Sequence, residues 1–348
     1  MTETLTVGII PGDGIGRDVT RAARIVLNLI NERCADISFV YKDMDVGEAA
    51  IKKHGSAFPD ETREGISNCD VILFGAIGAP HDFVVLSGIR YGFNLFANVR
   101  PIKSFPGVKV LHPDADLVVI RENTEGLYSG VENQVTPDVV MSMKVATETA
   151  CDRIARWGFR FATLRKRKKI TVFHKANIMK ITDGLFLRCA RKVHQTEYPN
   201  IEYEEVIIDA GCMKLVQDPS QFDVLLLENL YGDVVSDLCA GLVGGLGVVP
   251  GANFGEELAV FEAVHGSAPD IAGQGVANPL AVTMSTVMML NHLAGTRDDP
   301  SCRESADQLK AAYNRTLSDG CLTRDLGGDL NTQGFVDALI ERIEAPPS

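Results

Sequence analysis

The sequence lacks an apolar run long enough for a transmembrane helix. Nowhere in its 348 residues is there an uninterrupted apolar stretch of the ~18 residues that a membrane span requires. Residues 1–6 contain an acidic side chain and no basic cluster, so they do not resemble a secretory signal. We therefore expect a cytoplasmic protein with no membrane partner.

Paired metal-binding cysteines are also absent. The eight cysteines are scattered along the chain, and no two of them form a CxxC motif. Several lie within apolar or helical stretches, which is typical of structural thiols in a reducing compartment; a redox or zinc role is the alternative. The eight are Cys34, Cys69, Cys151, Cys189, Cys212, Cys239, Cys302 and Cys321.

Basic residues are fewer than acidic ones. The chain has 34 Lys and Arg against 46 Asp and Glu, a net charge of −12, whereas a general nucleic-acid binder needs a basic surface. The densest basic run, residues 165–169, is interpreted as a solvated loop before a strand, and no nucleic-acid partner is expected. The ordinary proportion of hydrophobic residues, 45%, excludes a disordered or fibrous chain.

Short apolar runs alternate with helical patterns along most of the chain, which predicts an α/β fold with a largely parallel sheet. No internal repeat or low-complexity linker interrupts this alternation. The segment 238–247 (LCAGLVGGLG) is expected to form a glycine-rich helix and turn. Strands are predicted at residues 5–10, 37–42, 69–74, 117–121, 170–173, 204–208 and 224–227, and helices at 17–32, 149–158 and 183–195.

A glycine-rich loop, PGDGIG at residues 11–16, lies between the first predicted strand and helix. Such a loop can hold a phosphate at a helix N-terminus. The spacing is GxGxG, not GxGxxG, and Asp13 in its centre would repel a pyrophosphate. A tight turn between strand and helix remains the alternative.

Three arginines, Arg90, Arg100 and Arg121, lie at predicted strand ends and loop edges. The planar guanidinium forms paired hydrogen bonds with carboxylates. A single arginine near a turn is usually a surface residue. Three of them in an acidic protein favour a polycarboxylate substrate.

Two carboxylates, Asp233 and Asp237, are four residues apart after a predicted strand that ends at Glu228-Asn229. On a helix this spacing places both on one face. They either complement the helix dipole or bind a hard cation such as Mg²⁺ or Mn²⁺. Asp209, at the end of the strand predicted at 204–208, is a candidate third ligand.

Two further segments carry candidate chemistry. Lys175, in HKAN at residues 174–177, follows a predicted strand and is either a surface residue or an anion contact or base. The loop HGSAPDIAG at 265–273, followed by ANP at 277–279, is long enough to surround a flat ligand with its backbone. An acid in that loop can accept hydrogen bonds from ribose hydroxyls and would repel a 2′-phosphate.

These motifs occur together, and in the same order, in the β-decarboxylating dehydrogenases that act on isocitrate, 3-isopropylmalate or homoisocitrate. The chain resembles this family nearly from end to end. The resemblance rests on NVRP at 98–101, RENTEG at 121–126, HKAN at 174–177, NLYGDVVSD at 229–237 and HGSAPDIAG at 265–273.

The resemblance implies a two-domain isocitrate/isopropylmalate dehydrogenase-type fold, not the Rossmann fold. Residues 1–97 and 245–348 would form a discontinuous large domain on the cofactor side. Residues 98–244 would form a small domain with the dimer interface, the metal-binding aspartates and an arm that clasps the partner chain. The expected assembly is a homodimer whose active sites are shared between chains.

The resemblance also implies a role for each site residue. Tyr128 protonates the enol after carbon dioxide leaves, and Lys175 reaches into the partner's site to help remove the C2 hydroxyl proton. Asp233 and Asp237 bind the metal together with Asp209 of the other chain. Substrate binding is assigned to Arg90, Arg100, Arg121, Asn177, Val84, Leu86 and Ser87. NAD binding is assigned to Ile10, His265, Gly266, Ser267, Ala268, Asp270, Ile271 and Asn278.

The helix before Arg90 departs from the isocitrate enzymes, in which a serine and an asparagine contact the γ-carboxylate. Val84 and Leu86 occupy those positions. Isopropylmalate enzymes are apolar there but typically have RELTGG where this chain has RENTEG. We predict NAD-dependent oxidation of an isocitrate-like tricarboxylate, homoisocitrate or a tail-modified analogue.

Several alternatives remain open at the sequence level. Within the family these are 3-isopropylmalate or another alkylmalate, and tartrate or malate. A non-catalytic regulatory subunit of a hetero-oligomeric isocitrate dehydrogenase is one alternative of another class. A phosphate-binding module built on residues 11–16 is the other.

Overall fold

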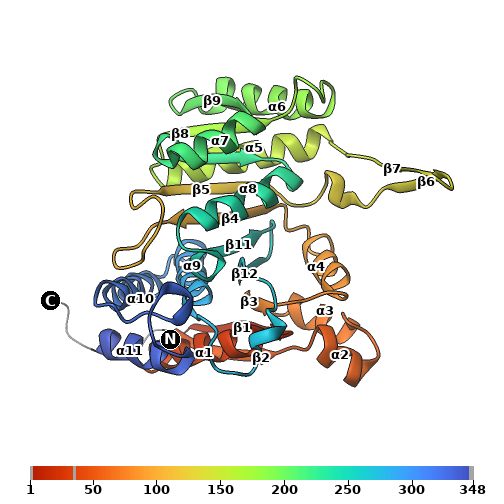
Figure 1. Cartoon of the computed structure of the whole chain (residues 1–348). Coiled ribbons are helices and arrows are strands. Elements are labelled where there is room, and N and C mark those ends of the chain that lie inside the picture. Colours follow the sequence, from red (N-terminus) through yellow and green to blue (C-terminus); the bar gives the residue numbers. More distant parts are fainter. Residues whose placement is uncertain (1–2, 34–36, 345–348) are drawn as a thin grey trace.

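The computed structural model of the chain describes residues 3–33 and 37–344. Ten strands form one mixed sheet in the order β2-β1-β3-β12-β11-β4-β5-β10-β8-β9, with helices packed against it (Figure 1). The described residues contain twelve strands, of which β6 and β7 lie outside this sheet. They are β1 (Glu3–Gly12), β2 (Ile37–Asp43), β3 (Val71–Ala76), β4 (Ala97–Lys103), β5 (Asp116–Glu122), β6 (Glu132–Thr136), β7 (Val139–Ser142), β8 (Lys169–His174), β9 (Glu202–Ile207), β10 (Val224–Leu227), β11 (Pro250–Phe254) and β12 (Ala259–Ala263).

The helices fill most of the connections between these strands. The α-helices are α1 (Gly16–Arg33), α2 (Gly47–His54), α3 (Asp60–Ser67), α4 (Asp82–Arg90), α5 (Glu148–Leu164), α6 (Thr182–Glu197), α7 (Ile208–Gln217), α8 (Asn229–Leu242), α9 (Leu280–Thr296), α10 (Pro300–Ser318) and α11 (Thr332–Glu344). Short 3₁₀ helices are η1 (Leu127–Ser129), η2 (Pro219–Gln221), η3 (Leu246–Val248), η4 (Pro269–Ile271) and η5 (Arg324–Leu326).

The predicted α/β class is confirmed, and so is a largely parallel sheet. The pairs β4–β5, β4–β11 and β11–β12 are antiparallel, and the other neighbouring pairs of the large sheet are parallel. Strands β3 and β10 are buried along their whole length, which explains their unbroken apolar sequences. The apolar runs in the sequence do not predict β4, β11 or β12.

Strand order brings distant parts of the chain together. β12 and β11 lie between β3 and β4, so residues 250–263 connect the strands of the N-terminal region to those of the middle region. The predicted domain boundaries at 97/98 and 244/245 stay a prediction. The strand and helix arrangement is nevertheless what positions Arg100 on β4 beside Arg121 on β5.

A two-stranded antiparallel hairpin, β6–β7, extends away from the large sheet (Figure 1). All of its strand residues are exposed. It occupies the part of the chain from which an arm was expected, and its role in clasping a partner stays a prediction.

Two features of the described residues bear on location and redox chemistry. None of the helices in residues 3–33 and 37–344 is both long and apolar enough to cross a membrane. Seven cysteines carry free thiols, and Cys34 lies outside the described residues.

The basic run 165–169 forms the connection between α5 and β8, as predicted, and Arg167 within it pairs with Asp116 and Asp223.

Candidate active site

Two buried arginines lie side by side at the centre of the sheet. Arg121 on β5 is 1% exposed and Arg100 on β4 is 5% exposed. The antiparallel register pairs Asn98 with Arg121 and Arg100 with Val119. Both guanidinium groups therefore project on the same side of the sheet, towards α8.

Asp233, in the second turn of α8, neutralises these arginines. Its Oδ1 accepts a hydrogen bond from Nη1 of Arg121 and lies 3.5 Å from Nη2 of Arg100. Burial tends to raise the pKa of Asp233, but the charges of Arg121 and Arg100 outweigh it and hold the pKa below its usual value. Burial and the neighbouring Arg100 lower the pKa of Arg121 to about 10, so it remains charged at neutral pH.

Tyr128 completes this cluster from η1. Its hydroxyl donates to Oδ2 of Asp233, and the Arg121 guanidinium lies 5.1 Å from the centre of its ring. Burial raises the pKa of Tyr128, and the hydrogen bond to Asp233 raises it further. A tyrosine in this setting holds its proton and can donate it to a bound molecule.

Arg90, at the end of α4, belongs to the same region. Its Nη2 donates to Oε1 of Glu262 over 3.1 Å. Its Nε is buried and, like Nε of Arg100, has no hydrogen-bond partner among the described residues. Two guanidinium groups with unused donors suit a carboxylate ligand.

A small cavity of about 130 Å³ lies against Arg90, Arg121 and Tyr128. Five predicted residues line it: Leu86, Ser87, Arg90, Arg121 and Tyr128. Val84 does not line it; its side chain is 52% exposed on α4. The other lining residues are Asp82, Phe83, Tyr91, Asn123 and Asn229. The cavity therefore has a cationic end and a wall provided by α4.

Asp237 provides the second carboxylate on the same face of α8. Its Oδ1 lies 3.4 Å from Nη1 of Arg100, and its side chain is 57% exposed. Oxygen donors of this kind are the ligands that Mg²⁺ and Mn²⁺ prefer, so Asp233 and Asp237 fit a hard divalent cation. Within the described part of one chain, however, no three His, Cys, Asp or Glu side chains form a metal-binding group.

Asp209 differs from its predicted position in the secondary structure. It lies in the first turn of α7, because β9 ends at Ile207, one residue before the predicted end of the strand. Its carboxylate is exposed to solvent and accepts a hydrogen bond from Nζ of Lys175. The structure thus brings the predicted partner-directed residues Lys175 and Asp209 together, with no contact to Asp233 or Asp237 recorded among the described residues. Asn177, two residues after Lys175, is exposed.

The predicted cofactor loop follows β12 and is largely exposed from Gly266 to Ile271. Nε2 of His265 is buried without a partner among the described residues, and burial lowers the pKa of this imidazole. Asn278 donates to Asp325 over 2.9 Å. Ser267 and Ala268 follow Gly266 in the loop, and Ala268 has a left-handed backbone conformation with φ 38°. An unsatisfied ring nitrogen and an exposed acid, Asp270, fit an adenosine group.

Ile10 is the exception among the predicted cofactor residues. Its side chain is fully buried in the apolar core between the sheet and α4. No surface of this side chain is open to a cofactor, and the role assigned to Ile10 stays a prediction. The physical reason is the alternation along β1, which directs Ile10 into the core.

The glycine loop 11–16 is a tight structural turn, not a phosphate cradle. The amide of Asp13 donates to Ala76 and the amide of Ile15 donates to Ser267, each over 2.8 Å. The Asp13 carboxylate accepts from the amide of Glu48 at the start of α2. The amides of Asp13, Ile15 and Gly16 are therefore used within the protein, which argues against the alternative of a phosphate-binding module built on this loop.

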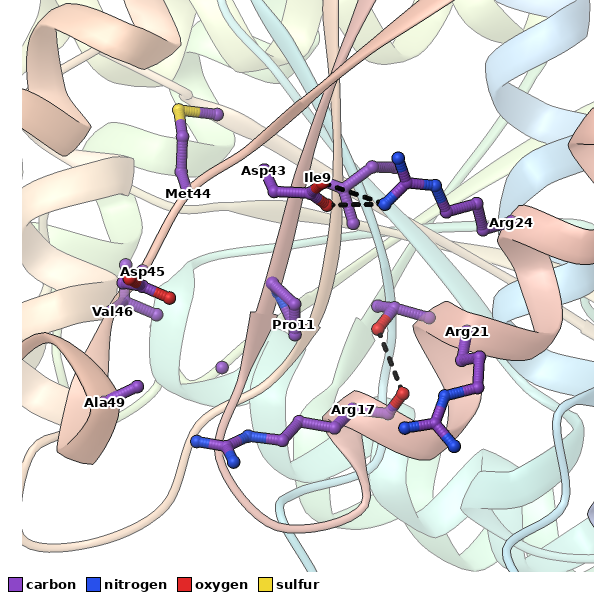
Figure 2. A pocket seen from close by; sticks show the side chains of 12 residues that line it. Ile9, Pro11, Arg17, Arg21, Arg24, Asp43, Met44, Asp45, Val46 and Ala49 are labelled. Carbon is purple, nitrogen blue, oxygen red and sulfur yellow. Dashed lines mark hydrogen bonds and ion pairs between the residues drawn. The ribbon is translucent and has the colours of Figure 1, made fainter.

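A larger pocket of about 440 Å³ opens beside this turn (Figure 2). Arg17 and Arg21 extend from α1 along it, and Arg24 points to Asp43, with which it pairs at 2.8 Å (Figure 2). None of the predicted site residues lines this pocket. The pocket is therefore separate from the arginine–aspartate cluster.

Sequence reasoning missed two residues that orient the arginines. The side-chain oxygen of Asn229 accepts from Nε and Nη2 of Arg121, over 2.9 and 2.7 Å. Glu262 on β12 is buried and pairs with Arg90. A carboxylate within the apolar strand FEAV was the available signal for Glu262, because such a group is rarely buried without a cationic partner.

Comparisons of the sequence and of the structure with known proteins find similarity to the same group of enzymes. Residues 6–339 match the family model described as isocitrate/isopropylmalate dehydrogenase. The chain is 45% identical to the 3-isopropylmalate dehydrogenase of Archaeoglobus fulgidus, over 97% of this chain and 98% of that protein. It is 44% identical to a mitochondrial regulatory subunit of the NAD isocitrate dehydrogenase of Dictyostelium discoideum, over 97% and 91%. The solved isocitrate dehydrogenase of Methylococcus capsulatus superposes with a TM-score of 0.91 at 40% identity, covering 98% of this chain and all of that one.

Proposed function

Because the chain belongs to the isocitrate/isopropylmalate dehydrogenase family, we propose that it is an NAD-dependent, metal-requiring oxidoreductase that oxidatively decarboxylates a 3-substituted malate. The observation that carries the proposal is the cluster of Arg100, Arg121, Asp233 and Tyr128, of which Arg121 and Tyr128 line a small cavity. Buried arginines with unused donors favour a carboxylate ligand, and a protonated tyrosine beside them can supply a proton.

The malate carboxylates would be bound by Arg90, Arg100 and Arg121. Fixing them at two or more points removes translational and rotational freedom before the reaction. Asn229 and Glu262 hold two of these arginines in place. We expect this half of the substrate to be recognised in the same way whatever the substituent at C3.

Two cofactors would complete the site. Asp233 and Asp237, with Asp209 of a second chain, would hold Mg²⁺ or Mn²⁺, which when bound polarises oxygen atoms and stabilises negative charge during decarboxylation. The loop from His265 to Ile271, with Asn278, would hold NAD, which when bound accepts the hydride. The exposed carboxylate of Asp270 favours NAD over NADP, because it would repel a 2′-phosphate.

The remaining chemistry falls to two side chains of the protein. Tyr128 would transfer its phenolic proton to carbon after carbon dioxide has left. Lys175 would act in the site of the other chain, taking part in removal of the C2 hydroxyl proton. Its pairing with Asp209, away from the Arg100–Asp233 cluster of its own chain, supports this arrangement.

Exposed apolar side chains support a homodimer. Met213 and Val216 on α7 and Val234 on α8 are more than half exposed, and Ile178 and Ile181 before α6 are exposed still further. Apolar residues gathered on one region of a surface mark an interaction site. Val140 and Met141 on the β6–β7 hairpin are also exposed, as expected of an arm that contacts a partner.

The wall of the cavity favours an uncharged substituent at C3. Phe83 and Leu86 supply apolar surface, and the carboxylate of Asp82 would repel an additional acidic tail. We therefore propose 3-isopropylmalate or a related alkylmalate as the substrate, in place of the tricarboxylate favoured by sequence motifs alone. Isocitrate is the second candidate, because the Ser87 hydroxyl lines the same wall and can donate to a carboxylate.

The test is NADH formation by the purified protein with Mg²⁺ or Mn²⁺. We expect 3-isopropylmalate to give a higher kcat/KM than isocitrate or homoisocitrate. The kcat/KM with NAD should be at least about tenfold higher than with NADP, a difference of about 1.4 kcal/mol. Excess chelator should abolish turnover. Asp82→Asn should raise kcat/KM for isocitrate and leave that for isopropylmalate nearly unchanged. Asp60→Asn, on neighbouring α3, is the matched control.

Two outcomes would contradict the proposal. A higher kcat/KM for isocitrate in the parent protein would refute the alkylmalate assignment. Absence of NADH formation with every malate would favour the non-catalytic subunit, whereas the presence of Tyr128, Lys175 and all three aspartates supports an active enzyme.

A further inference from the structure

A second cavity lies behind the strands that carry the substrate arginines. It has a volume of about 440 Å³ and lies between α5, β4 and β5 on one side and α9 and α10 on the other. Because side chains alternate along a strand, Arg100 and Arg121 face α8, whereas Pro101 and Val118 face this cavity. No residue of the candidate active site lines it.

The cavity is positively charged within an acidic protein. Its lining contains five cations and two carboxylates, although the whole chain carries a net charge of −12. Asp116 is already used by Lys103 and Arg167. The charged lining residues are Lys103, Arg165, Arg167, Arg303, Lys310, Asp116 and Asp307.

Three cations of this lining have no carboxylate partner within the described residues. Arg303 donates to the Asn291 side chain over 2.6 Å. Within the described residues, the side chains of Arg165 and Lys310 form no hydrogen bond or ion pair. Desolvation lowers the pKa of Arg165, and the nearby charge of Arg303 lowers it further. Two guanidinium groups that repel each other across a cavity would both be stabilised by an anion between them.

The side chain of Tyr313 also lines this cavity. Tyr313 is 5% exposed, lines the cavity, and has no hydrogen bond recorded to any described residue. Burial raises the pKa of Tyr313, so its hydroxyl remains a donor. The hydroxyl is not one of the buried unpaired atoms of the described residues, so it is open to the cavity and can donate to a ligand there.

Most of the uncharged lining is apolar and suits a flat ring. Phe105 packs edge-on against Tyr313, with ring centres 6.0 Å apart, and both line the cavity. Met284 and Val287 from α9 and Phe161 from α5 supply further apolar surface. Methionine side chains adapt to aromatic ligands, and aromatic rings pair favourably with one another.

We propose that this cavity is a second ligand site, for a small organic anion that carries a flat apolar ring, such as an aromatic phosphate or carboxylate. The anionic group would lie between Arg165, Arg303 and Lys310, and the ring would lie against Phe105 and Met284. The site is independent of the identity of the malate substrate. It combines a charged end and an apolar body, as small-molecule sites commonly do.

Phenyl phosphate is the probe that tests the site, with phenol and inorganic phosphate as its two halves. We expect saturable binding in titration calorimetry, with each half binding more weakly than the whole. Arg303→Gln and Arg165→Gln should each weaken binding by about fivefold or more through loss of a charge-assisted contact. Tyr313→Phe should weaken it less. Arg160→Gln, an exposed arginine on α5 outside the cavity, is the matched control and should bind as the parent does.

Methyl NMR of the methionines locates the bound probe. The chain has nine methionines, of which Met284 and Met288 line the cavity. We expect their two signals to shift with probe concentration and the other signals to stay in place, and saturating malate substrate to leave the shifts unchanged. Shifts that disappear on adding malate, or equal affinity in folded Arg303→Gln, Arg165→Gln and parent proteins, would overturn the proposal.

Discussion

Asp233 controls the charge balance of the candidate site. Two arginine side chains that are almost fully buried would be strongly destabilising without an anion, because desolvation of each ion costs several kcal/mol. Asp233 pairs with both and also accepts from Tyr128. Asp233 is thus the carboxylate that Arg100, Arg121 and Tyr128 share, and it would have to exchange partners when a metal ion and an anionic substrate bind.

Tyr128 gives the first prediction at the scale of single residues. Tyr128→Phe removes the proposed proton donor, so we expect kcat to fall by about 10²- to 10⁴-fold, with a smaller change in KM. Steady-state kinetics with the preferred malate measure both. Tyr41→Phe is the control, because the Tyr41 hydroxyl is buried and has no partner among the described residues. A kcat loss similar in both variants would argue against proton donation by Tyr128.

His292 gives a prediction about stability and pH. Its ring lies 5.5 Å from Phe254 and 5.7 Å from Phe261, and burial lowers its pKa. As the pH falls through the unfolded value of about 6.5, the unfolded chain takes up a proton that the folded chain does not. The free energy of unfolding therefore decreases on acidification, until the pH falls below the folded pKa.

The substitution His292→Leu should remove this contribution. Between pH 7 and the onset of general acid denaturation, the slope of unfolding free energy against pH should be smaller in the variant, by at most about 1.4 kcal/mol per pH unit for one proton. Urea titrations at several pH values measure the slope. His54→Gln, at an exposed position on α2, is the control. Equal slopes in His292→Leu and parent would contradict the prediction.

At the scale of elements, sequence patterns predicted the parallel strands better than the antiparallel ones. β1, β3, β8 and β10 are apolar runs buried on both faces, and such runs are visible in the sequence. β4 contains a proline and a buried arginine, ANVRPIK, so its pattern does not resemble a core strand. It is a strand of the sheet because it pairs with β5 and β11.

The candidate site could be predicted only where a motif fixed both residue type and neighbours. RENTEG and NLYGDVVSD gave Arg121 and Asp233, which the fold brings into contact. Neither spacing nor composition revealed that Asn229 would accept two hydrogen bonds from Arg121, because that contact depends on the approach of α8 to β5. The family resemblance assigned Ile10 to the cofactor, whereas its side chain is fully buried in the apolar core.

The glycine turn between β1 and α1 gives the element-scale prediction. Gly14 has φ +55°, and a Cβ on it would lie 1.9 Å from the backbone oxygen of Ser267. Gly55 has φ +75° with nothing within 4 Å, so it isolates backbone strain alone. Gly55→Ala should lower the free energy of unfolding by about 1–2 kcal/mol.

Gly14→Ala should cost the same strain and, in addition, displace the loop that begins at His265. We therefore expect a larger loss of stability than in Gly55→Ala, and a KM that rises more for NAD than for the malate. Urea unfolding and steady-state kinetics measure these quantities. If the two glycine variants were equally stable and had equal NAD affinity, the turn would not position the cofactor loop.

At the scale of the whole molecule, the net charge opposes the proposed ligands. A chain with a charge of −12 repels polycarboxylates and nucleotides at long range. Binding must therefore depend on local clusters of cations, and the structure has one such cluster on each side of β4 and β5. Arg100 and Arg121 lie on one side, and Arg165, Arg303 and Lys310 on the other.

The last prediction concerns sharing of sites between chains. Lys175 pairs with Asp209 at an exposed position, while Tyr128 and Asp233 pair with each other in the arginine cluster of the same chain. If a complete site takes Lys175 from one chain and Tyr128 from the other, Lys175→Ala and Tyr128→Phe proteins are each inactive alone. In a heterodimer of the two, one site would contain both defects and the other would contain none.

Equal mixing with free exchange of subunits makes half of the dimers heterodimers, so we expect recovery of about a quarter of the parent activity for a symmetric dimer. Differently tagged chains, purified in sequence on both tags, give the heterodimer directly and should show about half of the parent activity. Mixing Tyr128→Phe with Asp233→Asn is the control, because both residues belong to the same half of the site and no complete site can form. If verified heterodimers of the first pair stay inactive, the sites lie within single chains and the pairing of Lys175 with Asp209 needs another explanation.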